Sequence, residues 1–426
     1  MSQVVDKFGG WLSSQLPDHP ERVRKLLQLV YRGVGFQAGH FPSKKRMPAR
    51  EYLQAYTANF MADMIKDASA SAIVNIFMPC ELFHAMGMKV AVPEALATYV
   101  VCTSAEMPFV EKAGEMGAPS SFCSYHKVLM GLAETGIYKR PALIANTTLA
   151  CDANQLSFRH LAEKWQVPHV VIDVPYEVSE DSVIYVADQL RGLKTVLEET
   201  SGRHLDENKL KETLARSVRT QENFRSYLAK RPAYHLPEAL TPELLSAFAN
   251  HLLLGLPEAE TYTEMLNKDL ETAPKLTTEK KLLWMHILPN WQDSMKTIFQ
   301  GEDNHRVEIV SCDLAYDSLM EMDPDQPYES MARRVVYGSY NGPGSRRMQR
   351  TLEMAKEMEA DGILIFCQWG CKQTQGIALS AKRLFEDNGF PTLVLDGDGC
   401  DRTNGGGQQI VTRAQAFLEQ LEEGSR

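Results

Sequence analysis

The sequence predicts an α/β protein with two lobes, each containing a parallel sheet, together with N-terminal and connecting helices. Short apolar runs alternate with helical stretches over 71–180 and again over 281–426, whereas 1–70 and 181–280 have helical periodicity alone. Strands that alternate with helices in this way are typical of parallel sheets with crossover connections. A chain of 426 residues is also too long for a single compact core.

The N-terminal region and the first lobe follow in order. Apolar residues at helical spacing predict helices within 1–70. The first lobe, 71–180, is predicted to contain a helix over 79–87 that ends at a glycine. Its strands are short apolar runs, and they are expected at 71–77, 89–93, 141–146 and 169–174.

The helical connector, 181–280, is strongly charged and centres on LRGLKTVLEETSGRHLDENKLKETLARSVRTQENF. The second lobe, 281–426, ends in an amphipathic helix expected over 412–421. Its strands are expected at 281–288, 306–311, 362–366 and 391–395.

Composition excludes several classes of protein. A net charge of -10 and a pI near 5.6 argue against a nucleic-acid or anionic-membrane surface. No apolar run approaches the roughly 18 residues that a membrane-spanning helix needs. The first residues, MSQVVDKFGGWLSSQ, have neither the basic leader nor the apolar core of a signal peptide, so we expect a cytoplasmic protein.

The eight cysteines are too sparse for a disulfide scaffold. Cys151, Cys312, Cys367 and Cys371 lie at or just beyond predicted strand ends, and Cys123 precedes a helix. Backbone N–H groups at such places favour thiolates, although a lone cysteine is also a common small core residue. The C-x-x-x-C of FCQWGCKQ is one residue longer than a thioredoxin-type pair, and there is no zinc ribbon. The residues by themselves indicate a dispersed thiolate site or ordinary core cysteines.

Other motifs are uninformative. The glycine-rich stretches 338–344 and 397–399 match neither a P-loop nor a dinucleotide fingerprint. The histidines form no HExxH pair; His84 shares a predicted helix with Glu81, which helix packing explains as well as catalysis.

Several segments, in order over more than three hundred residues, resemble the 2-hydroxyacyl-CoA dehydratases, which are related to benzoyl-CoA reductase subunits. These segments are PCELFHAMGMKVAVPE, FCSYHKVLMG, CDANQLSFRHLAEKW, HVVIDVPYEVSEDSVIYVADQL, ADGILIFCQWGCKQ and FPTLVLDGDGCDRTNGGGQQIVTRAQAFLE. The resemblance implies two Rossmann-like lobes and the D-component subunit of an iron–sulfur enzyme.

The resemblance also implies a [4Fe–4S] cluster bound by three cysteines that are far apart in the chain. Motif by motif, the ligands are Cys123, Cys151 and Cys371, with Cys367 as a neighbour of the last at the end of a strand. Three protein ligands leave one iron open to substrate or water, as in catalytic metal sites.

The implied reaction is that of a hydro-lyase, in which water is eliminated from a 2-hydroxyacyl-CoA to give a 2-enoyl-CoA through a ketyl radical. One electron comes from an ATP-dependent iron–sulfur activator protein, under anaerobic conditions, and a homologous second subunit completes a heterodimer. The family pattern makes Glu94 and Glu81 catalytic candidates; a solvated loop carboxylate is the other interpretation of Glu94. No serine stands near Ile76, where the pattern places one, which leaves open whether the chain is the substrate-binding or the partner subunit.

Two alternatives remain within the resemblance. A benzoyl-CoA reductase-like subunit would reduce an aromatic thioester. A double-cubane or electron-transfer iron–sulfur protein would have no acyl-CoA site at all.

Overall fold

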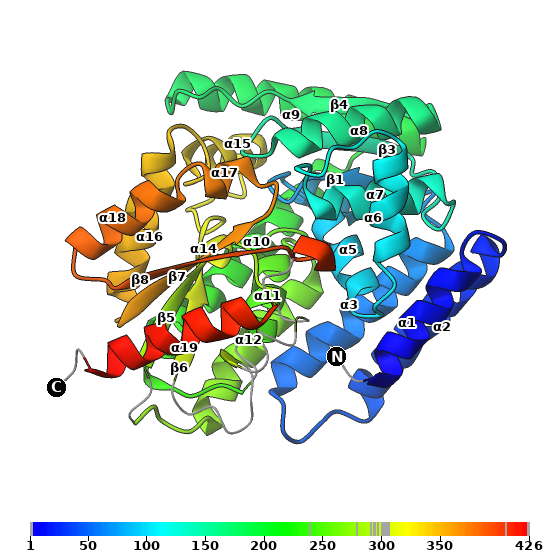
Figure 1. Cartoon of the computed structure of the whole chain (residues 1–426). Coiled ribbons are helices and arrows are strands. Elements are labelled where there is room, and N and C mark those ends of the chain that lie inside the picture. Colours follow the sequence, from blue (N-terminus) through cyan, green and yellow to red (C-terminus); the bar gives the residue numbers. More distant parts are fainter. Residues whose placement is uncertain are drawn as a thin grey trace.

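The computed structural model describes residues 3–237, 240–277, 280–289, 292, 295, 298–299, 307–404 and 407–423. It contains two four-stranded sheets, each flanked by helices, and it confirms the predicted α/β fold with two parallel-sheet lobes (Figure 1). Within the described residues, none of the helices combines the length and the apolar character that crossing a membrane requires.

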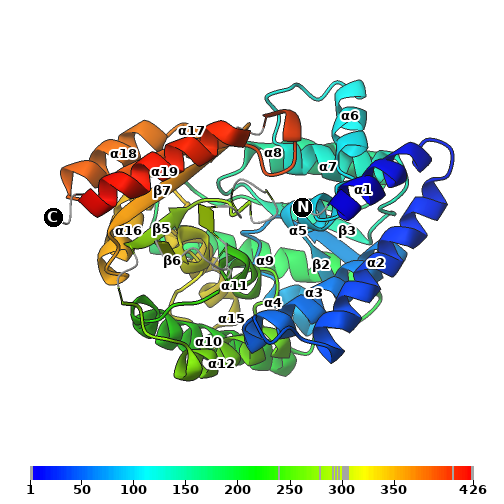
Figure 2. The same ribbon diagram turned by 60° about the horizontal axis from the view of Figure 1, so that its bottom comes forward.

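The N-terminal region is helical, as predicted. Proline at the first position favours the start of two of its helices, because proline has no N–H group to leave unpaired there. Figures 1 and 2 show the first two helices as an antiparallel pair at one side of the molecule. The helices are α1 (Gln3–Gln15), α2 (Pro20–His40) and α3 (Pro48–Lys66).

The first lobe has its strands where the apolar runs predict them. They are β1 (Ser71–Val74), β2 (Lys89–Ala91), β3 (Leu143–Thr147) and β4 (His169–Ile172). Its helices are α4 (Glu81–Ala85), α5 (Pro93–Val101), α6 (Met107–Glu115), α7 (Ser124–Glu134) and α8 (Asp152–Trp165).

The connector is helical throughout its described elements, which are α9 (Glu180–Ser201), α10 (Glu207–Lys230), the 3-10 helix η1 (Arg231–Ala233), α11 (Leu240–Asn250) and α12 (Pro257–Thr272). The Ser179 hydroxyl caps the start of α9 by accepting a hydrogen bond from the Ser182 N–H, and Gly202 ends the helix in the left-handed region (φ 67°).

The second lobe contains β5 (Lys280–Met285), β6 (Val307–Cys312), β7 (Gly362–Gln368) and β8 (Thr392–Gly397). Its helical elements are α14 (Asp313–Tyr316), α15 (Pro327–Tyr337), α16 (Gly344–Glu357), α17 (Lys372–Gln375), α18 (Ala378–Asp387), the 3-10 helix η2 (Arg402–Asn404) and α19 (Gly407–Glu423). Strand β5 begins one residue before the expected start of this lobe, and Arg306 of the strand expected at 306–311 lies outside the described residues. The domain boundaries themselves stay a prediction.

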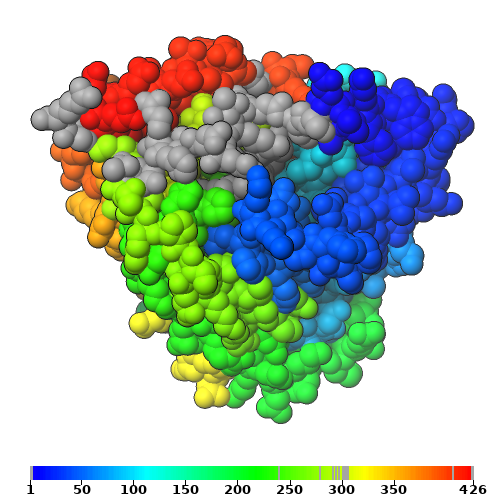
Figure 3. Space-filling view, turned by 90° about the horizontal axis from the view of Figure 1, so that it is seen from below, coloured from blue at the N-terminus to red at the C-terminus, as the bar shows by residue number. Residues whose placement is uncertain are grey.

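The two sheets have equivalent strand orders, β2-β1-β3-β4 and β6-β5-β7-β8, and all their pairings are parallel. The order reverses at β1 in one lobe and at β5 in the other, and ligands of open α/β sheets bind beyond the carboxyl ends of strands at such reversals. Viewed from below, the N-terminal residues (blue) and the C-terminal residues (red) occupy different sides of the molecule, and the connector (green) spans the lower part of the view (Figure 3). The segments that follow β3 and β7 carry the candidate site.

Candidate functional site

Each of the three predicted ligand cysteines stands immediately before a helix. Cys123 is the N-cap residue of α7, Cys151 that of α8 and Cys371 that of α17. Cys151 follows β3 and Cys371 follows β7, so these two occupy equivalent positions in the two lobes. The N–H groups at a helix start carry partial positive charge, which favours an anionic sulfur or other negative group nearby.

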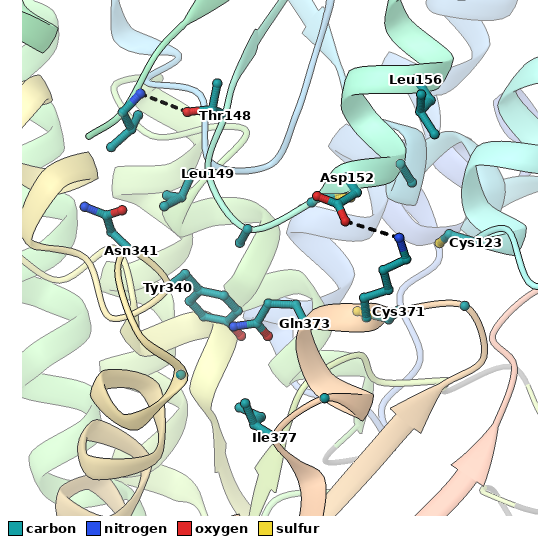
Figure 4. A pocket seen from close by; sticks show the side chains of 18 of the residues that line it. Cys123, Thr148, Leu149, Asp152, Leu156, Tyr340, Asn341, Cys371, Gln373 and Ile377 are labelled. Carbon is teal, nitrogen blue, oxygen red and sulfur yellow. Dashed lines mark hydrogen bonds and ion pairs between the residues drawn. The ribbon is translucent and has the colours of Figure 1, made fainter. Parts of the chain in front are cut away.

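A single pocket of about 530 Å³ between the lobes is lined by all three cysteines. Figure 4 shows Cys123 and Cys371 toward one side of this pocket, with Leu149, Tyr340 and Asn341 toward the other. An exposed ion pair joins the lobes at its edge, between Lys372 Nζ and Asp152 (3.5 Å; Figure 4). The other lining residues include Ser121, Phe122, Thr148, Ala150, Leu156, Val174, Tyr176, Gly370, Gln373 and Ile377.

The Cys371 loop lies directly against the Cys123 loop. A Cβ atom on Gly370 would be 2.7 Å from the carbonyl oxygen of Ser121 and 2.9 Å from the backbone nitrogen of Cys123, so only glycine fits. The φ angle of Gly370 is 79°, which also favours glycine. The Trp369 indole N–H donates to the Ser120 carbonyl (3.2 Å) and fixes the same contact.

The three thiols are close enough to influence one another. Burial raises the pKa of Cys123, and the neighbouring Cys151 and Cys371 raise it further. Burial, the Glu94 carboxyl and Cys371 together raise the pKa of Cys151 to about 12. A metal group would reverse this effect, because coordination requires the thiolate and releases its proton.

The residues present fit a cluster with three thiolate ligands. Soft sulfur donors suit iron–sulfur clusters, and here they come from three separate segments around one pocket. Among the residues that the structure describes, no group of three or more His, Cys, Asp or Glu side chains could hold a metal ion. A cubane places each thiolate on a different iron, so its ligand sulfurs lie farther apart than those around a single ion. The ligand assignment therefore stays a prediction.

The other cysteines do not line this pocket. Cys367, on β7, is buried at a position paired with Asp396 of β8. Cys80, Cys312 and Cys400 are also buried, and Cys102 is exposed at the end of α5. Of the two thiols in FCQWGCKQ, the structure places Cys371 in the pocket wall and Cys367 in the sheet.

Glu94 lies in the first turn of α5, just beyond the end of β2. Burial raises its pKa to about 7. Its Oε2 atom is buried without a hydrogen-bond partner among the described residues. Its carboxyl interacts electrostatically with the thiols of Cys151 and Cys123, although Glu94 does not line the pocket itself. A carboxyl with this pKa can both hold and release a proton near neutral pH.

Glu81 lies in different surroundings. It is fully buried, pairs through both carboxylate oxygens with Arg334 of α15, and accepts a hydrogen bond from Ser217 Oγ of α10 (3.0 Å). Burial raises its pKa, but the Arg334 guanidinium outweighs burial and holds the pKa below the ordinary value. Glu81 does not line the pocket. Its contacts favour a structural role that ties the first lobe to α10 and α15.

Replacing Glu81 by Gln distinguishes a structural role of this carboxylate from the predicted catalytic role. We expect the free energy of unfolding to fall by about 3–5 kcal/mol, because the substitution leaves the Arg334 charge buried and uncompensated. Denaturant unfolding measures this. Glu180→Gln is the control: Glu180 pairs with the adjacent Arg333 at the surface, and its loss should leave the unfolding midpoint nearly unchanged. Loss of turnover at unchanged stability in Glu81→Gln would instead favour catalysis.

Sequence reasoning missed several residues of the pocket. The glycine-rich stretch 338–344 contributes Tyr340, Asn341, Gly342 and Gly344 to the pocket. It matches no known motif, so nothing in the sequence pointed to these residues. His126 was also missed, although it belongs to FCSYH: its Nε2 is 3.9 Å from the Cys151 sulfur and its Nδ1 is 2.7 Å from Ser157 Oγ. Burial lowers the pKa of His126 to about 3, so the ring beside Cys151 is neutral.

Comparison with known proteins agrees with the predicted resemblance. The chain is 26% identical over 376 residues to the (R)-phenyllactyl-CoA dehydratase alpha subunit of Clostridium sporogenes, which covers 80% of this chain and 87% of the relative. It is 24% identical over 389 residues to lactoyl-CoA dehydratase subunit alpha of Anaerotignum propionicum (81% and 89%). It is 28% identical over 170 residues to the (R)-phenyllactyl-CoA dehydratase beta subunit of Clostridium sporogenes (38% and 43%).

The family model for 2-hydroxyglutaryl-CoA dehydratase, D-component, matches residues 75–421, which include every strand of both sheets except β1, and all three pocket cysteines. The chain therefore belongs to this family of dehydratase components.

Proposed function

We propose that the chain is a subunit of an iron–sulfur 2-hydroxyacyl-CoA dehydratase, a hydro-lyase that converts a 2-hydroxyacyl-CoA into a 2-enoyl-CoA. The observation that carries the proposal is the meeting of Cys123, Cys151 and Cys371 around one interlobe pocket, in a chain whose relatives are dehydratase subunits. The pocket of about 530 Å³ has room for a small metal group together with part of a substrate.

Cys123, Cys151 and Cys371 would hold a [4Fe–4S] cluster. When bound, it supplies a one-electron centre in which one iron has no protein ligand. The helix starts after Cys123 and Cys151 supply backbone N–H groups to these two sulfurs, from Tyr125 and from Ala153 and Asn154, which favours negative charge there.

The chain's own residues would manage protons and water. The elimination removes a hydroxide ion from the α-carbon and a proton from the β-carbon, and both must leave the pocket or be held in it. Glu94 would hold and release a proton beside the pocket, because burial raises the pKa of its carboxyl to about 7. Tyr340, Leu149 and Ile377 supply apolar surface that would keep bulk water from the acyl group.

The subunit composition of the relatives suggests the partners of this chain. The phenyllactyl-CoA dehydratase has both an alpha and a beta subunit, and both are similar to this chain. We propose that this chain likewise works with a homologous second subunit, and that an ATP-dependent iron–sulfur activator protein supplies the electron.

The test is anaerobic co-purification with candidate second subunits, followed by an iron count and an acyl-CoA screen with the activator and ATP. We expect iron in the purified complex and 2-enoyl-CoA only when subunits, activator and ATP are all present. Ring reduction of benzoyl-CoA without any dehydration would favour the reductase alternative. Iron without acyl-CoA binding would favour an electron-transfer protein.

A further inference from the structure

A buried carboxylate, Asp398, directly follows the last residue of β8; its exposed fraction is 1%. Its Oδ1 accepts hydrogen bonds from Gln368 Nε2 (3.0 Å), from the backbone N–H groups of Cys400 (2.9 Å) and Asp401 (3.0 Å), and from Ser124 Oγ. Its Oδ2 lies 3.3 Å from Asn404 Nδ2. One carboxylate is therefore surrounded by donors from three segments of the chain.

Two of these donors belong to the segments that carry Cys123 and Cys371. Ser124 follows Cys123 at the start of α7 in the first lobe. Gln368 ends β7 in the second lobe, and its carbonyl accepts a hydrogen bond from the Cys371 N–H (3.0 Å). Gln368 Nε2 also donates to Ser124 Oγ (3.1 Å). Asp398, Gln368 and Ser124 thus form a buried hydrogen-bonded bridge between the lobes, and we name these three residues the interlobe clamp.

Shape complementarity around the clamp leaves little room for the lobes to shift. A Cβ on Gly399 would lie 2.1 Å from the Tyr125 hydroxyl oxygen, and Gly399 N–H donates to Gln368 Oε1 (2.7 Å). Gly370 of the second lobe likewise packs closely against the Cys123 backbone of the first. The lobes are therefore held in contact at Cys123 and Cys371 by both fit and buried hydrogen bonds.

We propose that Asp398 is a positioning residue, which fixes the distance between Cys123 and Cys371 across the cleft through Ser124 and Gln368. Buried charge-assisted hydrogen bonds are stronger than neutral ones and hold their geometry, which a site assembled from two lobes requires. The statement that these two thiols bind a cluster rests on the proposed function. The statement that the clamp fixes the distance between them does not depend on it.

The variants are Ser124→Ala, Asp398→Asn and their combination. Ser124→Ala removes the direct hydrogen bond from α7 to Asp398 but leaves the carboxylate and its 398–401 turn intact, so a role confined to that turn would be unaffected. Asp396→Asn is the matched control, since Asp396 lies two residues before Asp398, on β8, with a side chain that is 74% exposed.

The first measurement uses the full chain without iron. A short bifunctional thiol reagent is added under anaerobic conditions, and peptide mass spectrometry counts bridges between Cys123 and Cys371 relative to single alkylation of each. We expect bridging to fall several-fold in Ser124→Ala and in Asp398→Asn while single alkylation does not fall. The double variant should lose no more than the larger single loss, because both changes weaken the same connection: Ser124→Ala removes its donor, and Asp398→Asn removes the charge of its acceptor. Equal bridging in wild type and both single variants would overturn the proposal.

The second measurement uses protein loaded with iron. We expect a chelator to remove iron from Ser124→Ala about tenfold faster than from wild type, as for other residues that orient metal ligands. The electron paramagnetic resonance lines of the reduced protein should broaden, whereas Asp396→Asn should match wild type in both. Wild-type protein that binds no iron would refute the proposed function alone, because the bridging experiment still decides the role of the clamp.

Discussion

Replacement of Cys123, Cys151 or Cys371 by serine is expected to abolish iron binding and dehydration together, each to the background of the assay. Serine is nearly the same size as cysteine, so the fold should persist. Its hydroxyl is a hard and weakly acidic donor, however, and it replaces a soft thiolate poorly on iron. Iron per chain, visible absorbance and product formation after anaerobic purification measure the three effects.

The remaining cysteines provide the controls for this experiment. Cys367 is the most informative control, because it lies only four residues before Cys371 but on the buried strand β7, outside the pocket wall. Serine at Cys367, Cys102, Cys312 or Cys400 should leave iron content unchanged. Iron loss in Cys367→Ser together with iron retention in Cys371→Ser would contradict the ligand assignment and leave the family membership intact.

Replacement of Glu94 by Gln is expected to lower turnover by about 100- to 10,000-fold, the usual contribution of a general acid or base, with iron content unchanged. Glutamine keeps the size of the side chain but can no longer exchange a proton. Steady-state turnover and an iron count on the same sample measure the effect. The structure already replaces the interpretation of Glu94 as a solvated loop carboxylate, because Glu94 lies in the first turn of α5 with a buried carboxyl oxygen. Unchanged turnover in Glu94→Gln would therefore assign this carboxyl a structural role.

The pH dependence of Glu94 gives an independent check. Because burial raises its pKa from 4.5 to about 7, the folded protein holds this proton more tightly than the unfolded chain does. The contribution of Glu94 to stability is therefore full below pH 4.5 and is lost as the pH rises through 7. In Glu94→Gln this loss should be absent, so the variant should gain stability relative to wild type between pH 5 and pH 8. If Glu94 acts as a base, wild-type turnover should rise through the same range.

Much of the fold could be predicted from local patterns, because the strands are short apolar runs, most of them buried; β4 and β8, at the edges of the sheets, are only partly buried. The strand order could not be predicted, since the pairing of β1 with β3 depends on contacts between residues about seventy positions apart. The ion pair of Glu81 is a similar case: Arg334 lies 253 residues away, and nothing near Glu81 in the sequence announces it. The catalytic interpretation of Glu81 came from a family pattern, which carries no information about such a partner.

In the candidate site, too, some residues could be predicted from the sequence and others could not. Cys123, Cys151 and Cys371 could be selected by resemblance, and their positions before helices are readable from the sequence. Tyr340, Gln373 and Ile377 could not be selected, because they reach the pocket only through the placement of one lobe against the other. Asp398 could be seen only as part of a glycine-rich stretch, since its donors come from Ser124 and Gln368 as well as from its own turn.

The separation of the pocket cysteines along the chain has a consequence for biosynthesis. Cys151 and Cys371 stand on different lobes, so a ribosome must release most of the polypeptide before the last wall of the pocket exists. Early folding of the first lobe would expose Cys123 and Cys151 without their counterpart, open to oxidation or to stray metals. On the proposed function, the three-cysteine site is complete only after the second lobe has been translated, so iron delivery must follow the synthesis of both lobes.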